Sequence, residues 1–173
     1  MVSENLEKFA KSIENKNTDK AEKLIQKISE DKKKDTGIKG IEGLQKVGSD
    51  RAKELRKHGY DSIESLAQAS EKELAKIPKV GKKSATKIIK SAQGQRKIEK
   101  EIEGYRHALE GIIQTLEEER LLTMPQKISE GKYPKNELKN IKEEMQARAT
   151  HEFRPANERG FNEAWSDILE ALS

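Results

Sequence analysis

An all-α fold is predicted by the composition of the 173-residue sequence and by the spacing of its apolar residues. Apolar residues make up 32% of the chain, charged residues 38% and aromatic residues only 4%, so the core must be thin. The sequence is rich in lysine and glutamate, which favour helices, and poor in the aromatic residues that favour strands. Apolar residues also recur at spacings of three and four in several segments, which is typical of amphipathic helices.

The N-terminal region, residues 1–30, is predicted to be a helical hairpin. Its two helical patterns consist of Leu6, Phe9, Ala10 and Ile13, followed by Ala21, Leu24, Ile25 and Ile28. Residues 31–39 contain four lysines, two aspartates and one glycine, with Ile38 as the only apolar residue. Because this segment lacks helical periodicity, it is predicted to be a basic linker.

A tandem repeat with an offset of 33 residues occupies the next region, residues 40–94. The matched pairs are Leu44 with Ile77, Lys46 with Lys79, Val47 with Val80, Gly48 with Gly81, Ala52 with Ala85, and Leu55 with Ile88. Each copy is predicted to contain a helix, a tight turn and a second helix, and with the helix between the copies the region has about five short helices in total. Gly48 and Gly81 are expected to give the turns their backbone freedom.

Residues 95–173 are predicted to form a long, coiled-coil-like helix followed by C-terminal helices. The long helix is assigned to residues 95–122, because an apolar stripe runs along it: Ile98, Ile102, Tyr105, Leu109, Ile112 and Leu116. Such a stripe needs a covering partner, either a second chain in a homodimer or the C-terminal helices of the same chain. Pro125 and Pro134 are expected to bracket a loop, and Phe161 and Trp165 to face the core of the last helix.

The net charge of +4 is distributed unevenly along the sequence. Residues 1–30 carry six basic and six acidic side chains, residues 31–100 carry nineteen and ten, and residues 101–173 carry ten and fifteen. The middle of the chain is therefore a basic block of net charge +9, followed by a segment of net charge −5. A basic block of this size favours polyphosphate partners such as nucleic acid.

No catalytic, metal-binding or membrane-spanning pattern is found in the sequence. The chain has no cysteine, and its three histidines, His58, His107 and His151, are too far apart in sequence for a ligand cluster. The consecutive glutamates 117–119 point in different directions on a helix, which is typical of a solvated face. Without a long apolar run or a signal peptide, we expect a cytoplasmic, non-enzymatic protein that uses no cofactor and does not enter membranes.

The segments Gly59–Ala67 and Lys83–Ile89, together with the repeat, resemble tandem helix-hairpin-helix domains. The N-terminal domain of archaeal recombinases and the C-terminal domain of the bacterial RNA polymerase alpha subunit are similar. The resemblance implies a compact five-helix domain that binds duplex DNA across the minor groove through hairpin backbone amides. Lys46 and Lys79 stand where the family usually has glycine, and no phosphate-binding loop follows, so the recombinase activity is not implied.

Elementary electrostatics favours the same interpretation, because free N–H groups at a helix N-terminus attract phosphate oxygens. The predicted DNA-binding residues are Lys46, Val47, Gly48, Ser49, Arg51, Lys53, Lys79, Val80, Gly81, Lys82, Lys83 and Lys87. Such contacts position a protein on DNA without reading bases. The predicted function is largely sequence-independent binding of duplex DNA in repair, recombination or nucleoid organisation, with branched or single-stranded DNA as alternative ligands. The competing hypothesis is a protein-interaction module, for which the acidic residues Glu42, Asp50, Glu54 and Glu71 leave room.

Overall fold

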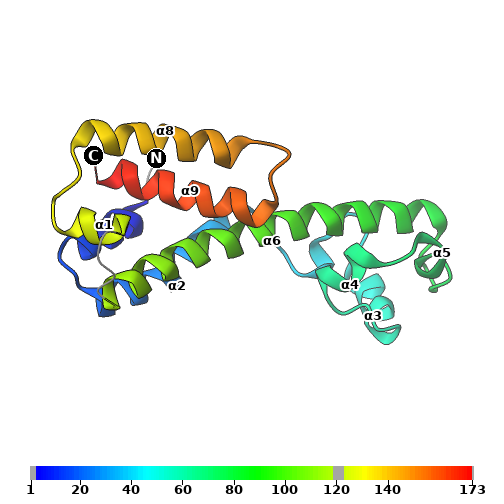
Figure 1. The fold of residues 1–173 in the computed structure, drawn as a ribbon. Coiled ribbons are helices and arrows are strands. Elements are labelled where there is room, and N and C mark those ends of the chain that lie inside the picture. The colour runs from blue at the N-terminus through cyan, green and yellow to red at the C-terminus, as the bar shows by residue number, and fades with distance from the viewer. Residues whose placement is uncertain (1–2, 119–122, 173) are drawn as a thin grey trace. The chain divides into compact units, whose positions relative to one another are not determined.

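All regular elements of the part of the chain that the computed structural model describes, residues 3–118 and 123–172, are helices (Figure 1). They are α1 (Glu4–Glu14), α2 (Thr18–Asp35), the 3-10 helix η1 (Ile41–Gly43), α3 (Ser49–Lys57), α4 (Ile63–Gln68), α5 (Glu71–Leu74), α6 (Lys82–Glu117), α7 (Met124–Ser129), α8 (Lys135–Thr150) and α9 (Ala156–Ala171). The predicted all-α fold is therefore confirmed. No described helix is both long enough and apolar enough to cross a membrane.

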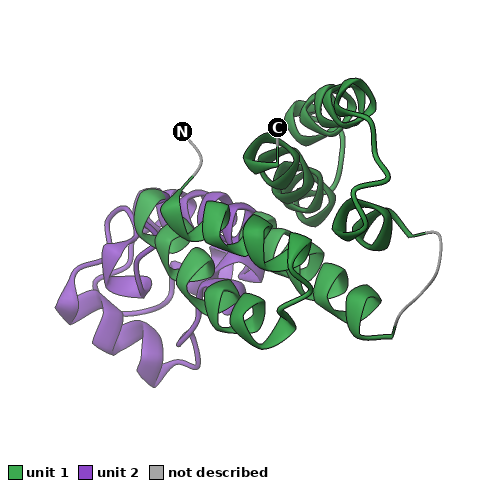
Figure 2. Ribbon diagram, turned by 90° about the vertical axis from the view of Figure 1, so that its left-hand side faces the viewer, with its two compact units in different colours: residues 1–35, 100–173 green, residues 36–99 purple. Residues whose placement is uncertain are grey.

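The chain forms two compact units, which Figure 2 distinguishes by colour. Unit 1 comprises residues 1–35 and 100–173, and unit 2 comprises residues 36–99. Helix α6 contributes its N-terminal part to unit 2 and its C-terminal part to unit 1. The N-terminal hairpin of α1 and α2 thus shares a unit with the C-terminal helices, although it was predicted to be a separate segment.

The core of unit 1 collects apolar side chains from α1, α2, α6, α8 and α9. Tyr105, Leu109, Ile112 and Leu116 of the predicted coiled-coil stripe are buried in it, together with Phe9 of α1. These four residues of the stripe are therefore covered by helices of the same chain, whereas Ile98 is half-buried and Ile102 is buried outside this cluster. The homodimer stays a prediction. The expectation that Phe161 faces the core is wrong, because Phe161 is 37% exposed. Trp165, four residues later in α9, is buried as expected.

Two predicted boundaries of the helices in unit 1 are wrong. Helix α2 continues to Asp35, so the first five residues of the expected linker 31–39 are helical. The three lysines 32–34 lie in its last turn, where positive charge interacts favourably with the helix dipole. The expected loop between Pro125 and Pro134 is partly helical, because Pro125 lies in the first turn of α7, where no backbone donor is needed.

Helix α6 is longer at its N-terminus than predicted. It starts at Lys82 and continues through Gly94, so the second helix of the second repeat and the long helix are one element. Side chains on both sides of Gly94 fix it within unit 2: the amide of Gln93 donates to the carbonyl of Ala67 at 3.2 Å, and that of Gln95 donates to the carbonyl of Lys39. Residues 119–122, the predicted end of the helix, lie outside the described residues.

Gly104 of α6 and Gly160 of α9 allow these two helices to pack closely within unit 1. A Cβ atom at Gly104 would overlap the backbone carbonyl of Asn157, and one at Gly160 would overlap the backbone carbonyl of Glu101. In an isolated helix, glycine destabilises by up to about 1 kcal/mol relative to alanine. The close packing of α6 against α9 explains why glycine occupies positions 104 and 160, although it weakens an isolated helix.

Unit 2 has its own core, which contains both members of each apolar pair of the repeat. The buried residues are Ile41, Leu44, Val47, Ala52, Leu55, Ile63, Leu66, Ala67, Leu74, Ile77, Val80, Ala85, Ile88 and Ala92. Ala52 and Ala85 are completely buried one turn into α3 and α6, as expected for small residues at close helix contacts. The repeat thus places equivalent side chains in one shared core.

Candidate nucleic-acid interface

Two turns with the same backbone hydrogen bonds join the helices of each repeat. We call residues 44–48, between η1 and α3, hairpin 1, and residues 77–81, before α6, hairpin 2. The N–H of Val47 donates to the carbonyl of Leu44 at 3.0 Å, and the N–H of Val80 donates to that of Ile77 at 3.0 Å. The helix after each turn begins with an equivalent hydrogen bond. The N–H of Ala52 donates to the carbonyl of Gly48, and the N–H of Ala85 donates to the carbonyl of Gly81, each at 2.9 Å. The sequence repeat is therefore a repeat of local structure.

The left-handed residue of each turn is a lysine, not a glycine. Lys46 and Lys79 both have φ of +67°, at the third position of a turn that favours glycine. Gly48, in contrast, has extended backbone (φ −115°, ψ −178°), and Gly81 does not have positive φ either. The expectation that Gly48 and Gly81 provide the backbone freedom of the turns is wrong, because the turn bends two residues earlier.

Backbone N–H groups are unpaired at the start of α3 and α6. Among the hydrogen bonds of the described residues, none uses the N–H of Gly48 or Ser49 at the start of α3, or of Gly81 or Lys82 at the start of α6. Unpaired N–H groups at a helix N-terminus, which is the positive end of the helix dipole, attract anions.

Val47 and Val80 were also predicted to offer free amides, and this prediction is wrong. Their N–H groups close the two turns, and their side chains are buried at 7% and 2% exposure. They anchor the turns to the core and leave the two following residues as donors.

The space next to Gly48 and Gly81 is open. A Cβ atom built on either glycine meets no other atom within 4 Å. Neither the backbone conformation nor packing within unit 2 therefore requires glycine at these positions. A ligand that approaches the backbone closely would require it, because a side chain would stand between the ligand and the free amides.

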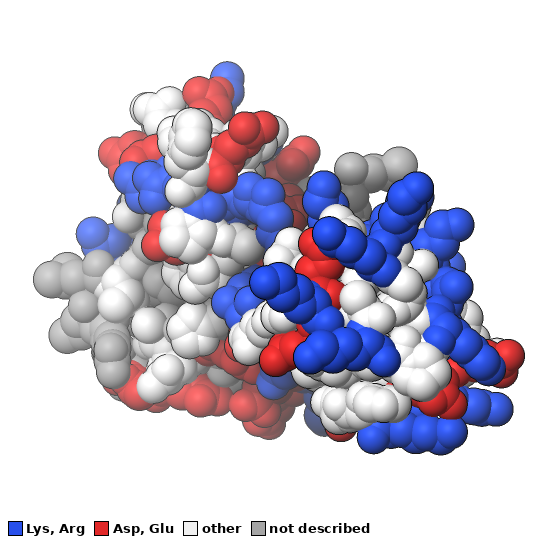
Figure 3. Space-filling view, turned by 90° about the vertical axis from the view of Figure 1, so that its right-hand side faces the viewer, with Lys and Arg blue, Asp and Glu red and all other residues white. Residues whose placement is uncertain are grey.

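Lysines are concentrated in the N-terminal part of α6, directly after hairpin 2. A surface depression of about 520 Å³ is lined by Lys46 of hairpin 1 and by Lys83, Ser84, Thr86, Lys87 and Lys90 of α6. No acidic side chain lines it, and no salt bridge of the described residues involves any of its four lysines. In Figure 3, which views the molecule from the right-hand side of Figure 1, Lys and Arg side chains cover more of the right-hand part of the view than acidic side chains do. The geometry suits a phosphate-bearing ligand.

Three residues of this depression were missing from the predicted site: Ser84, Thr86 and Lys90. Their signal is in the sequence, because Lys83, Thr86, Lys87 and Lys90 follow one another at spacings of three, one and three. This spacing puts them on one face of a helix. The predicted site ended at Lys87 and did not include Lys90.

The acidic side chains of unit 2 are partly neutralised by basic neighbours outside the depression. Glu54 pairs with Lys57 at 2.8 Å, Glu42 pairs with Arg56, and Glu64 pairs with Arg96. The hydrogen bond from Lys57 lowers the pKa of Glu54 below its usual value. Unit 2 carries fifteen basic and eight acidic side chains, a net charge of +7, and unit 1 carries the remaining twenty and twenty-three, a net charge of −3.

Arg51 and Lys53, the two remaining predicted residues, lie on α3. Lys53 is exposed. Arg51 is half-buried, and its guanidinium donates to the carbonyl of Lys46 at 2.7 Å and to the carbonyl of Lys79 at 2.8 Å. Arg51 therefore links hairpin 1 and hairpin 2, whose apolar residues share one core.

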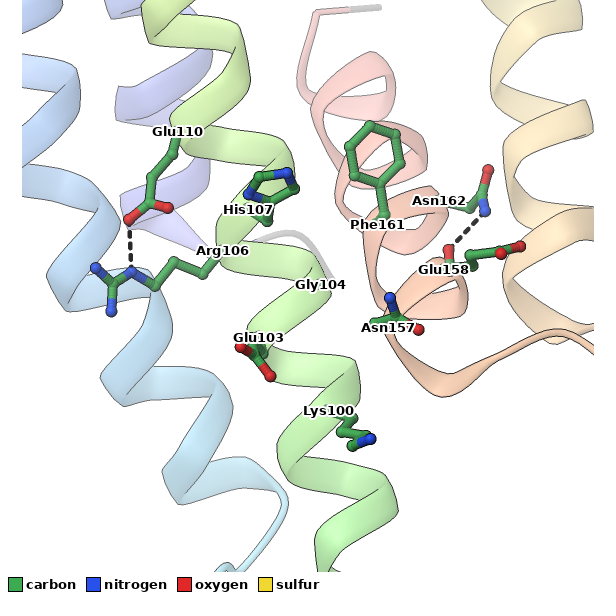
Figure 4. Close-up of a pocket in the computed structure, with 10 residues that line it drawn as sticks. All are labelled: Lys100, Glu103, Gly104, Arg106, His107, Glu110, Asn157, Glu158, Phe161 and Asn162. Atoms are coloured by element: carbon green, nitrogen blue, oxygen red, sulfur yellow. Dashed lines mark hydrogen bonds and ion pairs between the residues drawn. The ribbon is translucent and has the colours of Figure 1, made fainter.

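A second depression, of about 540 Å³, lies in unit 1 between α6 and α9 (Figure 4). His107 and Phe161 line it from the two helices, and Arg106 pairs with Glu110 at 2.7 Å on its edge. The side chain of Asn162 donates to the backbone carbonyl of Glu158 at 2.6 Å, so it is held within α9. No cluster of three or more potential metal ligands occurs among the described residues.

A sequence model of the SAM-like helix-hairpin-helix tandem family matches residues 38–93, which is the repeat together with both hairpins. The chain therefore contains a helix-hairpin-helix domain, a class that typically binds nucleic acid. Searches of curated proteins and of solved structures gave no significant match. The more specific resemblance to domains of archaeal recombinases and of the RNA polymerase alpha subunit stays a prediction.

Proposed function

We propose that this protein binds duplex DNA through unit 2, largely independently of base sequence, and that it is not an enzyme. The observation that carries the proposal is the pair of equivalent helix N-termini with unpaired N–H groups, each preceded by a glycine whose Cβ side is open. One such site can hold one phosphate, and two sites on one rigid domain suit the repeating phosphates of a nucleic-acid backbone.

The charges of unit 2 support the same ligand. Six lysines lie on or directly after the two hairpins without a salt bridge to any described acidic side chain: Lys46, Lys79, Lys82, Lys83, Lys87 and Lys90. All six are exposed, so their charges are available to phosphates. A protein that neutralises phosphates in this way gains affinity mainly from counterion release, which is insensitive to base sequence.

Repair, recombination and nucleoid organisation are the cellular processes we propose, with localisation to the cytoplasm in association with the nucleoid. Each requires a protein that holds DNA without reading its sequence. Unit 1, with net charge −3, is proposed to remain off the DNA, because its acidic surface is repelled by phosphates.

The test is a binding titration of the full-length chain against fluorescein-labelled 20-bp duplexes of two unrelated sequences at several salt concentrations. We expect similar affinities for both, with a log–log slope of about −0.9 for each phosphate neutralised. Single-stranded DNA, a four-way junction and duplex RNA of matched length are measured in parallel to establish which ligand binds most tightly. A flat salt dependence with strong sequence preference would refute the proposal, and failure to bind any nucleic acid would favour the protein-interaction module.

A further inference from the structure

Arg51 joins the two turns at equivalent points. Its Nε donates to the carbonyl oxygen of Lys79 at 2.8 Å, and its Nη1 donates to the carbonyl oxygen of Lys46 at 2.7 Å. Lys46 and Lys79 are the two residues with φ of +67°, and they are 33 positions apart in the sequence. One side chain therefore binds the same carbonyl of both repeats, directly before the buried valine of each turn.

The chemistry of the guanidinium suits this bridge. Its five donors lie in one plane in a fixed fork, so a single group can hold two acceptors at a set separation. A lysine has the same charge but places its donors on one rotatable ammonium, and it cannot reproduce the fork. No backbone N–H of the described residues donates to either carbonyl, so the bridge depends on Arg51.

The bridge has no counterpart in the second repeat. The residue 33 positions after Arg51 is Ser84, whose short side chain lines the depression beside hairpin 2. Within the described part of the chain, only α3 thus provides a side chain that hydrogen-bonds to both turns. Arg56, on the same helix, pairs instead with Glu42 and contacts neither hairpin carbonyl.

We propose that Arg51 is a positioning residue that fixes the separation of the two phosphate-binding hairpins, so that both engage one nucleic-acid backbone at once. This inference rests on the proposed function of unit 2. Two sites held at a fixed separation bind a common ligand more tightly than two independent sites, because the second contact forms without further loss of freedom. The role assigned to Arg51 therefore differs from the direct phosphate contact predicted from the sequence.

The test compares the full-length variants Arg51→Lys and Arg51→Ala with the wild-type protein on the labelled 20-bp duplex. If Arg51 positions the hairpins, both variants lose affinity to a similar extent, about tenfold, because neither can form the bridge. If Arg51 contacts a phosphate by charge alone, Arg51→Lys binds like the wild type and only Arg51→Ala is weakened. Arg56→Lys is the matched control, and it is expected to bind with unchanged affinity.

A measurement on the wild-type protein covers the case in which Arg51→Lys fails to fold. The Nε–H proton of Arg51 should exchange more slowly with water in the NMR spectrum of the free protein than that of Arg106, which binds an exposed carboxylate. Its resonance should move little when the duplex is added, while the amides of Gly81 and Lys82 shift. A large shift of the Arg51 Nε–H on binding, or exchange as fast as that of Arg106, would overturn the positioning role.

The two proposals fail in different ways. Failure of the wild-type chain to bind any nucleic acid would refute the proposed function, and the positioning role with it. Wild-type binding with an unaffected Arg51→Lys variant would refute the positioning role alone.

Discussion

Hairpin 1 and hairpin 2 have nearly the same backbone but very different charged neighbours. Both have a left-handed lysine, a buried valine and a glycine with open space beside it. In the twelve residues from Lys46 to Lys57 there are five basic and two acidic side chains, whereas the equivalent twelve from Lys79 to Lys90 contain five lysines and no acid. The duplicated backbone thus carries an asymmetric charge distribution.

The salt bridges increase this difference. Near hairpin 1, Lys57 and Arg56 are engaged by Glu54 and Glu42, and Arg51 binds backbone carbonyls. Among the described residues, no salt bridge involves the five lysines on or after hairpin 2: Lys79, Lys82, Lys83, Lys87 and Lys90. Hairpin 2 is therefore expected to provide most of the phosphate affinity, while hairpin 1 provides a second backbone site and the residue that links the two.

The largest effect is expected from reversing charge at hairpin 2 with Lys82→Glu and Lys83→Glu. Two lost phosphate contacts at about 0.1 M salt correspond to roughly 60-fold weaker binding, before any added repulsion. The same reversal at hairpin 1, Lys53→Glu with Lys57→Glu, should weaken binding less, because Lys57 is already paired with Glu54. Affinity is measured by fluorescence anisotropy, with circular dichroism to verify folding and Lys135→Glu with Lys139→Glu on α8 as the distant control. Equal losses at the two hairpins would contradict the asymmetry.

Copying the charges of hairpin 2 into hairpin 1 should have the next largest effect, in the opposite direction. Asp50 and Glu54 occupy the positions of Lys83 and Lys87, so Asp50→Lys with Glu54→Lys places lysine at these two positions in both repeats and removes both acids of residues 46–57. We expect about tenfold tighter duplex binding and a steeper salt dependence, since new contacts are added and Lys57 loses its carboxylate partner. An unchanged salt slope would mean that hairpin 1 does not approach the phosphates.

Gly48→Ala and Gly81→Ala test the open space beside the two free helix N-termini. Because neither glycine has positive φ or a neighbour within 4 Å of an added Cβ, the free energy of unfolding should change by less than about 1 kcal/mol. Affinity should fall several-fold, since the methyl group would stand between the amides and a phosphate. Thermal unfolding and binding are measured on the same samples. A variant that binds normally would show that the ligand does not come close to that backbone.

The smallest effect is expected from Lys46→Gly and Lys79→Gly. Glycine adopts φ near +67° without strain, so each substitution should leave stability unchanged or raise it by up to about 1 kcal/mol. Each also removes one charge, so duplex affinity should fall by a few-fold. If the lysine contacts the ligand, the substitution should raise the free energy of unfolding and lower the duplex affinity. If the lysine only supports the turn, stability and affinity should change in the same direction.

The sequence alone determined the all-α fold, the position of the repeat and three of the four lysines that line the basic depression. These features depend on interactions between residues that are close in the sequence. Examples are the turn hydrogen bonds of residues 44–47 and 77–80 and the first helical hydrogen bonds, which are accepted by Gly48 and Gly81. The two copies of the repeated sequence therefore have the same backbone conformation at their turns. The lysine stripe along α6 was also visible, although its last member, Lys90, was not assigned to the site.

Contacts between residues far apart in the sequence were decided only by the tertiary structure. The packing of α6 against α9 at Gly104 and Gly160, and the grouping of the N-terminal hairpin with the C-terminal helices, depend on which apolar faces meet. The bridge from Arg51 to the carbonyls of both hairpins is of the same kind, since an arginine on a helix looks in sequence like any other solvated charge. The planar guanidinium of Arg51 finds a fixed pair of carbonyl acceptors only because the folded chain places the two turns next to each other. The sequence predicted that Arg51 contacts a phosphate, whereas the structure shows that it links the two repeats.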